Sequence, residues 1–492
     1  MTTSPSLSAP SPAPRPRAGS DAWAGAMTNV PREHGFEPLA VDGSIPAELR
    51  GTQYRNGPGL VELMGRRYGH WFDGDGLISA VRFSDAGAHG AAKITQTQGL
   101  LEERERGKPY FGAYGTRPPG MFNPMRVIRA AKGTSKNPAN TALMNWDGRL
   151  FALCEIGRPF EVDPETLDAI GETDLGGVIP RSFSAHPHGV AARGAQYNIG
   201  TRIGRPNALD LFVMRADGSA GRLVTLPLEA PTMVHDFAVT ERHAVIFVAP
   251  LRLRLLPTLL GRRAFADSLE WDHARGTEVI LVPLDAPASA RRFRVPSFWA
   301  WHYGNAFERD GKIVVDLVRY RDFPTSAAWL AGIARREMRV DGADGILSRA
   351  VIDPKAESLD FTPLRDRTGE FPRVAPGREA RAASTLYWTE HSTEEVGRSG
   401  PPDTVVRVDV ERGDVDAFTF PDGQYPSEAI FAPRPGREAE DDGWLLTSVY
   451  DAKRHRTSWA VLDAARVSDG PVATAHMDHH VPLTFHGLWR PA

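Results

Sequence analysis

Four histidines each open the same kind of local segment, and this recurrence constrains the fold more than any other feature of the chain. They are His186, His235, His302 and His486. After each of the first three, a short extended stretch and a polar turn lead into another apolar strand. A residue type repeated at the start of successive hairpins is expected where a radial β structure gathers side chains on one axis. Because imidazole is a frequent ligand of borderline transition metals, the pattern predicts an all-histidine metal centre on the axis of a β-propeller.

The composition favours many short strands over long helices. The 492 residues include 47 glycines and 40 prolines, and apolar strands followed by acidic turns recur at irregular spacing. The length exceeds the roughly 250–300 residues at which one core usually stops growing, but each propeller blade adds its own part of the core. We expect one all-β domain over residues 23–492, with loop and helix insertions that form a roof. Residues 1–22, rich in serine, proline and alanine, are expected to be a disordered tail.

Charge and cysteine content exclude several classes of protein. The 58 lysines and arginines against 61 aspartates and glutamates leave a net charge of -3, which offers no footprint for nucleic acid. The single cysteine, Cys154, rules out an intramolecular disulfide, suits a reducing compartment such as the cytoplasm, and is expected to be buried. No stretch reaches the roughly 20 apolar residues of a transmembrane helix. No obligate protein partner is evident.

Two segments have a helical pattern. One covers residues 325–335, and the other lies within residues 251–271, where leucines stand beside arginines. This mix suits a surface that dips into a lipid interface, so Leu251 to Leu260 is a candidate for peripheral membrane contact. A roof helix packed on the barrel, with its arginines in water, explains the same pattern equally well.

A series of motifs in a fixed order identifies a resemblance to a known family. They include YRNGPG at 54–59 and HWFDGDG at 70–76, followed by the segments at 139–141, 184–187, 235–237, 305–308, 370–373, 428–434, 442–446, 481–482 and 485–487. With these motifs the chain resembles the carotenoid cleavage oxygenases. The segment at 110–120 resembles the bacterial apocarotenoid oxygenases in particular.

The resemblance implies a fold and a set of site residues. The fold is a seven-bladed β-propeller that holds one Fe(II) per chain through His186, His235, His302 and His486. Carboxylates that accept the distal imidazole N–H, which fix the tautomer and ring orientation of metal-bound histidines, map onto Glu155, Glu370 and Glu428. One histidine of the family lacks such a partner, and by analogy we expect it to be His186. Thr141 maps onto the threonine that restricts an open position on the iron.

The implied reaction is O2-dependent cleavage of a conjugated double bond of an apocarotenoid into two carbonyl products, with a retinal-like aldehyde among them. Phe72, Trp301 and Tyr114 are candidate contacts to an apolar substrate. A hydroxystilbene cleaver of the same family is an alternative, in which Tyr114 and Lys136 would bind the phenol. A propeller that binds or isomerises a polyene without cleaving it is an alternative of another class.

Overall fold

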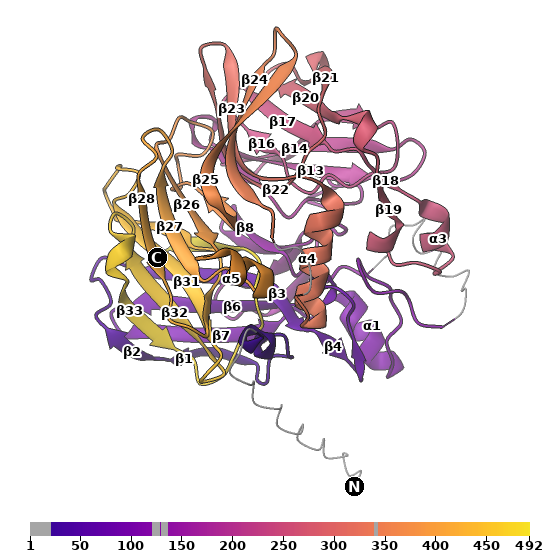
Figure 1. The fold of residues 1–492 in the computed structure, drawn as a ribbon. Helices are drawn as coiled ribbons and strands as arrows, with labels where there is room; N and C mark the ends of the chain where they lie inside the picture. Colours follow the sequence, from indigo (N-terminus) through magenta and orange to yellow (C-terminus); the bar gives the residue numbers. More distant parts are fainter. Residues whose placement is uncertain (1–20, 121–127, 129–135, 339–342) are drawn as a thin grey trace.

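The protein is mostly β, as the sequence predicts. The computed structural model describes residues 21–120, 128, 136–338 and 343–492 (Figure 1). The predicted tail at residues 1–22 therefore lies outside the described residues except for its last two. Within the described residues, the strands form six sheets of four to seven strands and two two-stranded ribbons.

The first three sheets follow one another along the chain, and the pairing within each is antiparallel. The first has the order β1-β7-β6-β3-β34, with β1 (His34–Pro38), β7 (Gly87–Ile94), β6 (Asp75–Ser84), β3 (Gly51–Leu60) and β34 (Gly487–Pro491). The second contains β8 (Ala142–Trp146), β9 (Arg149–Leu153), β10 (Phe160–Val162) and β11 (Ala169–Glu172). The third contains β12 (His188–Val190), β13 (Ala195–Arg202), β14 (Ala208–Arg215) and β15 (Ala220–Pro227).

The remaining sheets continue in chain order. The fourth contains β16 (Ala238–Val239), β17 (His243–Val248), β20 (Thr277–Pro283) and β21 (Arg291–Val295). The fifth contains β22 (Trp299–Arg309), β23 (Lys312–Tyr320), β24 (Ile346–Asp353), β25 (Ser358–Arg373), β26 (Thr385–Glu390), β27 (Thr404–Asp409) and β28 (Val415–Thr419). The sixth has the order β2-β33-β32-β31-β29, with β2 (Ala40–Gly43), β33 (Pro471–His476), β32 (Arg456–Asp463), β31 (Gly443–Asp451), β29 (Gln424–Pro426) and β30 (Ile430–Pro433) beside β31.

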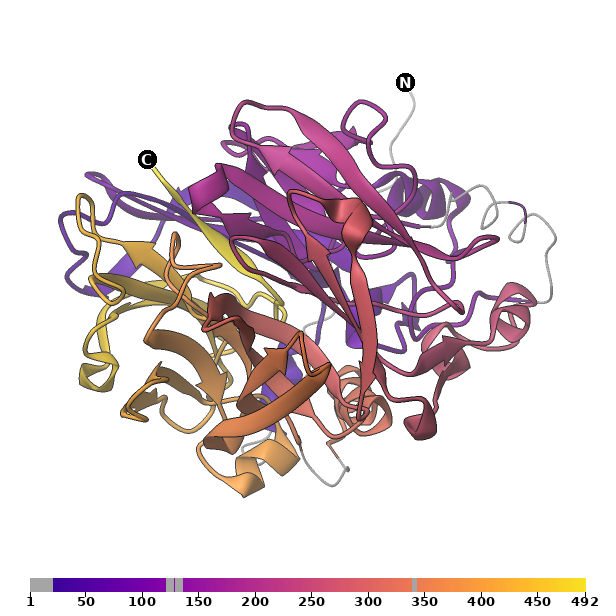
Figure 2. The same cartoon turned by 90° about the horizontal axis from the view of Figure 1, so that it is seen from above.

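The two ends of the chain close the structure on itself. The C-terminal strand β34 pairs with β3 of the first sheet, and the early strand β2 pairs with β33 of the last sheet. Seen from above, the colours run around the molecule in sequence order, so that the yellow strands return beside the indigo ones (Figure 2). Because full closure leaves no first or last sheet without a neighbour, each face of a sheet has another sheet to pack on.

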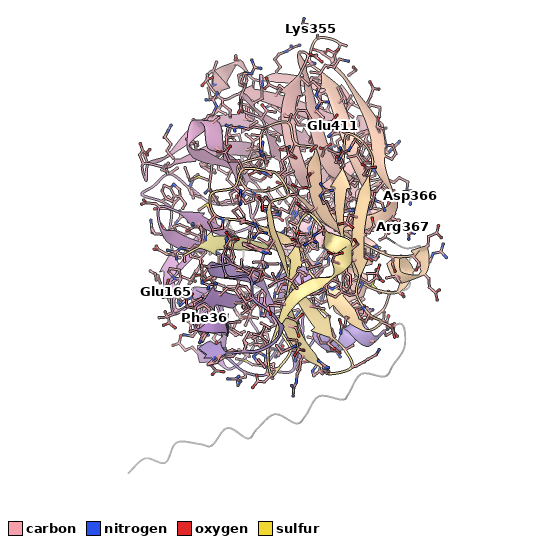
Figure 3. All side chains as sticks on the ribbon, turned by 90° about the vertical axis from the view of Figure 1, so that its left-hand side faces the viewer. Phe36, Glu165, Lys355, Asp366, Arg367 and Glu411 are labelled. Carbon is pink, nitrogen blue, oxygen red and sulfur yellow. The ribbon has the colours of Figure 1, made fainter. Side chains whose placement is uncertain are left out.

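Successive sheets share hydrophobic cores. Ile78 and Ala80 of the first sheet pack with Leu143 and Leu150 of the second, and the third and fourth sheets share a further cluster that includes Phe237. Strands covered on both faces read as continuous apolar runs rather than alternating ones, and every residue of β31 is accordingly buried. Charged side chains lie on the outer surface, where Figure 3 labels Glu165, Lys355, Asp366, Arg367 and Glu411.

The helices in the described part of the chain are short compared with the extent of the sheets. They are α1 (Gln98–Arg106), α3 (Leu255–Leu259), α4 (Phe323–Arg335) and α5 (Glu394–Ser399), with short 3-10 turns η1 (Ala22–Ala26) and η2 (Trp71–Asp73). The helix predicted over residues 325–335 is confirmed as α4, where the Asp322 side chain accepts from the N–H of Thr325 and caps the first turn. Trp329, Leu330 and Ile333 of α4 are buried, so this helix covers the structure as the predicted roof does.

The helix predicted within residues 251–271 is wrong for most of its length. The segment forms a ribbon of β18 (Leu251–Leu253) and β19 (Leu269–Trp271), and only the five residues of α3 and the short 3-10 turn η4 (Ala266–Ser268) are helical. Leu251 and Leu253 are buried on either side of exposed Arg252. This alternation has the period of a strand, and it turns these two leucines away from solvent. None of the helices in the described part of the chain has the length and apolar run that a membrane crossing needs.

Trp23 fixes the first described residues of the chain to the end of α5. Its side chain is fully buried, its indole N–H donates to the Ser399 carbonyl at 2.8 Å, and it packs against Gly400 at the end of α5. We predict that Trp23→Ala lowers the free energy of unfolding by about 3–5 kcal/mol, because truncating a buried tryptophan removes apolar contacts and leaves a cavity. Urea unfolding measures the change, with half-buried Trp271→Ala as the control. A loss no larger than the control's would contradict this role.

Candidate metal centre and its cavities

The four repeated histidines lie at equivalent places in four sheets. His186 and His235 precede β12 and β16 by two and three residues, His302 is in β22, and His486 directly precedes β34. Each of these strands is the end strand of its sheet. Because the sheets are arranged around a common centre, the same position in each sheet brings the four rings together. His186, His235 and His486 are buried, and the side chain of His302 is 15% exposed.

The rings form one compact cluster. The centroid of the His186 ring lies 4.5 Å from that of His235, 5.1 Å from that of His302 and 4.8 Å from that of His486. The His302 and His486 centroids are 4.7 Å apart. One nitrogen from each of His186, His302 and His486 lies within 4.8 Å of the others, which is close enough for the three to hold a metal ion.

Three glutamates turn three of the rings inward. Glu155 contacts Nδ1 of His235, Glu370 lies 2.5 Å from Nδ1 of His302, and Glu428 lies 3.0 Å from Nδ1 of His486. Because a carboxylate only accepts, a neutral imidazole beside one carries its hydrogen on Nδ1 and keeps its lone pair on Nε2. The carboxylates therefore leave three Nε2 atoms available as ligands. Glu428 is buried, whereas 21% of the Glu155 side chain and 12% of the Glu370 side chain are exposed.

His186 stands apart from the other three histidines. In the part of the chain that the structure describes, no carboxylate is hydrogen-bonded to its ring. Its Nε2 instead faces Nε2 of His235 at 3.0 Å. Since His235 has its hydrogen on Nδ1, its Nε2 offers only a lone pair toward His186. A cation that accepts both lone pairs would satisfy this contact, so the donor set fits a metal ion.

Burial keeps two of the imidazoles neutral. It lowers the pKa of His486 to about 4 against the opposing effect of Glu428, and burial with the three neighbouring imidazoles lowers the pKa of His186 well below its usual value. At His302 burial also lowers the pKa, but the charge of Glu370 outweighs it and the net shift is upward. Burial would raise the pKa of Glu428, but Arg373 and His486 hold it well below its usual range. Neutral imidazoles and an ionised carboxylate are the forms that metal binding requires.

Two cavities meet at the histidines. The α4-side cavity is lined by Trp71, Phe72, Thr141, His235, Trp301, His302, Tyr320, Trp329, Leu330, Ile333, Glu370, Phe371, Pro401, Pro402, Pro426, Ser427, Leu483, Thr484, Phe485 and His486. The Tyr114-side cavity is lined by Phe72, Asp73, Gly112, Ala113, Tyr114, Lys136, Pro138, Thr141, Cys154, Glu155, Ile156 and His235. Both therefore contain Phe72, Thr141 and His235.

The residues predicted to contact substrate lie at these cavities. The Phe72 ring stacks on His235 with centroids 6.4 Å apart, and Trp301 meets the same imidazole edge-on at 4.7 Å. The Tyr114 ring lies 5.3 Å from that of Phe72, and its buried hydroxyl has no hydrogen-bond partner among the described residues. Thr141 directly precedes β8, the end strand of the second sheet, and its hydroxyl donates to Asn140 at 3.0 Å.

The surroundings of Cys154 and Lys136 determine the protonation of the thiol and the ion pairing of the ammonium. Cys154 is buried beside Thr141 as predicted, and burial raises the pKa of its thiol to about 12. The Lys136 ammonium lies 2.6 Å from Asp75, 2.8 Å from Glu103 and 2.9 Å from the Tyr68 hydroxyl. The ammonium therefore donates hydrogen bonds to Glu103 and Tyr68 and forms an ion pair with Asp75. Lys136 thus lines the same cavity as Tyr114, but its charge is already paired with carboxylates.

Sequence reasoning missed several residues that support the site. Arg55 is fully buried and donates to Thr484 and to the carbonyls of Glu428 and Phe485, although its motif was recognised without a role for it. Arg373 donates to Glu428 at 2.8 Å, and the Tyr320 hydroxyl donates to Glu370 at 2.5 Å. Tyr320 lies in β23 without a motif of its own, so no signal in the chain pointed to it.

Known proteins resemble this chain over nearly its whole length. The family model described as retinal pigment epithelial membrane protein matches residues 27–491. An apocarotenoid-15,15'-oxygenase of Synechocystis is 34% identical over 99% of this chain and 99% of that protein. An isoeugenol monooxygenase of Pseudomonas nitroreducens is 26% identical over 92% of this chain and 94% of its own.

A solved structure agrees over nearly the whole chain. The crystal structure of the cobalt-substituted Synechocystis apocarotenoid oxygenase superposes with a TM-score of 0.87 at 33% identity, and covers 96% of this chain and 99% of that chain. The likeness confirms a propeller-type fold. The chain belongs to the retinal pigment epithelial membrane protein family of carotenoid oxygenases and is an enzyme of that class.

Proposed function

We propose that the protein binds one Fe(II) through His186, His235, His302 and His486 and uses O2 to cleave a double bond of an apocarotenoid. The observation that carries the proposal is the cluster of imidazoles at the meeting point of two cavities, with three Nδ1 atoms held by carboxylates. One O2 and one C=C bond are consumed and two C=O bonds form, so the oxygen atoms and electrons balance without a reductant.

Bound iron would bind and activate O2, because non-haem Fe(II) with open coordination positions can do so. The protein's own contribution is to place one double bond at the metal and to exclude water. Phe72, Trp301 and Phe371 offer aromatic faces around the imidazoles. A long conjugated chain would lie against these faces. Apolar pockets with a few polar groups hold such ligands in one orientation. Thr141 lies in both cavities, where its methyl would restrict one approach to the metal.

The proposed propeller has seven blades. The long strand β25 supports this count, because it pairs with β24 as far as Thr368 and with β26 from Gly369 onward. Counting its two halves separately divides the seven-stranded sheet into two four-stranded blades. Together with the five other large sheets this gives seven, all within one domain that starts near residue 23.

We also propose that the enzyme works in the cytoplasm and touches a membrane surface through α3. Leu256 and Leu259 of this helix are 67% and 37% exposed, and the exposed arginines Arg252 and Arg254 precede them. Apolar side chains flanked by cations suit a headgroup region. Leu251 and Leu253 take no part, because they are buried.

Cleavage of a hydroxystilbene-like phenol is the second candidate. The isoeugenol monooxygenase relative and the unpartnered Tyr114 hydroxyl favour it. Burial raises the pKa of Tyr114, so its hydroxyl stays a neutral donor. Lys136 argues against it, because its ammonium already donates to Glu103 and Tyr68 and forms an ion pair with Asp75. A protein that binds or isomerises a polyene without cleaving it would have the same histidines and is distinguished only by its products.

His302→Ala tests the metal centre. We predict loss of bound iron and of activity with the fold retained, because the substitution removes one imidazole from a site built of four. Iron content by mass spectrometry and the circular dichroism spectrum measure the two effects. His243→Ala is the control, since His243 pairs with Glu308 away from both cavities. Full activity of His302→Ala would refute the assignment.

Glu370→Gln tests the carboxylates. We predict iron binding or rate reduced by about 10–100-fold, the usual effect of removing the acceptor behind a ligating histidine. An equilibrium competition with a chromophoric chelator gives the iron affinity, and Glu308→Gln is the matched control. If iron affinity and rate both stay at their wild-type values, Glu370 does not support the metal.

Product analysis tests the reaction and the substrate class together. The Fe(II)-loaded protein is incubated in air with an apocarotenal and, separately, with a hydroxystilbene, and the products are identified by mass. We predict two carbonyl fragments from the apocarotenal, whose masses identify the bond that is cleaved. Fragments from the stilbene alone would establish the second candidate, and intact substrate in both reactions with iron bound would refute cleavage.

A further inference from the structure

His188 lies between two carboxylates and follows His186 by two residues. Its Nε2 is 2.8 Å from Asp236 and its Nδ1 is 2.5 Å from Glu379. The side chains of His188 and Asp236 are 12% and 2% exposed, and that of Glu379 is 30% exposed. Because both carboxylates only accept, both ring nitrogens donate. The imidazole therefore ties together two segments that lie 48 and 191 residues away in the sequence.

Asp236 connects His188 to the segments of two further histidines. It directly follows His235, and its Oδ1 accepts from the N–H of Phe237 at 2.7 Å. Its Oδ2 accepts from the N–H of Tyr303, the residue after His302, at 3.1 Å. One carboxylate thus contacts the backbone beside His235 and beside His302, and also holds the ring of His188. Three of the four histidine segments meet at Asp236.

Glu379 anchors the same network from the other side. Its second oxygen accepts from the N–H of Gly189 at 2.8 Å, so it holds the side chain of His188 and the backbone that follows it. The segment of Glu379 is itself fixed to β22, because Asn305 accepts from the N–H of Ala380 at 3.0 Å and donates to the Arg381 carbonyl at 2.8 Å. We call His188, Asp236 and Glu379, with these contacts, the His188 network.

His186 needs such an anchor more than the other three histidines. They each have a glutamate on Nδ1 that fixes the ring, whereas no carboxylate among the described residues is hydrogen-bonded to the His186 ring. Only Pro187 separates it from His188, and the fixed φ of proline limits the motion between them. Holding His188 therefore holds the backbone from which His186 projects.

We propose that His188 is a positioning residue that fixes His186 for metal binding, in place of the carboxylate that His186 lacks. The proposal rests on the proposed metal centre. A merely structural ion pair is the competing explanation, since breaking a buried charged pair destabilises a protein wherever it lies. The two explanations differ in what changes, because positioning alters the metal's affinity and ligand geometry, whereas a structural pair alters only the stability of the fold.

His188→Gln separates the two explanations. The glutamine amide donates from one end only and cannot bridge both carboxylates. His243→Gln is the matched control, because His243 also pairs with a carboxylate, Glu308, at 2.8 Å but lies in β17 away from both cavities. The Fe(II) dissociation constant is measured by chelator competition, and the electron paramagnetic resonance spectrum of the Fe(II)–nitric oxide adduct reports the ligand geometry. Thermal unfolding of the iron-free proteins measures stability.

We predict that His188→Gln weakens iron binding by about 10–100-fold, as loss of a ligand's supporting contact does, and changes the spectrum of the adduct. His243→Gln is expected to keep both at wild-type values. Glu379→Gln is a second variant, in case His188→Gln does not fold, because its side chain is partly exposed and keeps an oxygen that accepts from Gly189. It is also predicted to weaken iron binding. Wild-type affinity and spectrum in folded His188→Gln or Glu379→Gln would overturn the proposal. Absence of iron from the wild-type protein would instead refute the metal centre itself.

Discussion

The contact between an imidazole Nδ1 and a carboxylate is the interaction on which the site depends, as a hydrogen bond at His302 and His486 and as an ion-pair contact at His235. It selects the tautomer of His235, His302 and His486 and turns each Nε2 lone pair toward a common point. Burying a charged or polar group is costly unless it has a partner. Glu428 shows how this cost is offset, because His486, Arg373 and the N–H of Gly487 all donate to it.

Closure of the ring of sheets makes this arrangement possible. Residues that line the site come from all parts of the chain, and His486 reaches the centre because the C-terminal strand β34 returns to pair with β3. Arg55 of β3 then reaches Thr484 and the Phe485 carbonyl, so the same pairing that closes the ring also fixes the segment of His486. The fold and the metal centre therefore depend on each other: opening the ring would remove a ligand.

The sequence predicted the features that are local or that carry a motif. The histidines at the start of end strands, the glutamates behind them and the helix α4 all follow from short patterns or from the family resemblance. The segment at 251–271 was wrongly predicted as a helix because its leucines fit the period of a helix as well as that of a strand. In the structure Leu251 and Leu253 are buried on one face of a ribbon, as in a strand. The partners of His188 could not be predicted, because Asp236 and Glu379 meet it only after the sheets have closed.

A crystal structure of the Fe(II)-loaded protein, with anomalous diffraction recorded on either side of the iron absorption edge, tests the central claim most directly. The account predicts one iron peak per chain, with Nε2 of His186, His235, His302 and His486 at distances near the roughly 2.0–2.1 Å of metal–imidazole bonds. It also predicts that Nδ1 of the last three stays on Glu155, Glu370 and Glu428. An iron peak elsewhere, or one at which any of the four imidazoles is not a ligand, would contradict it.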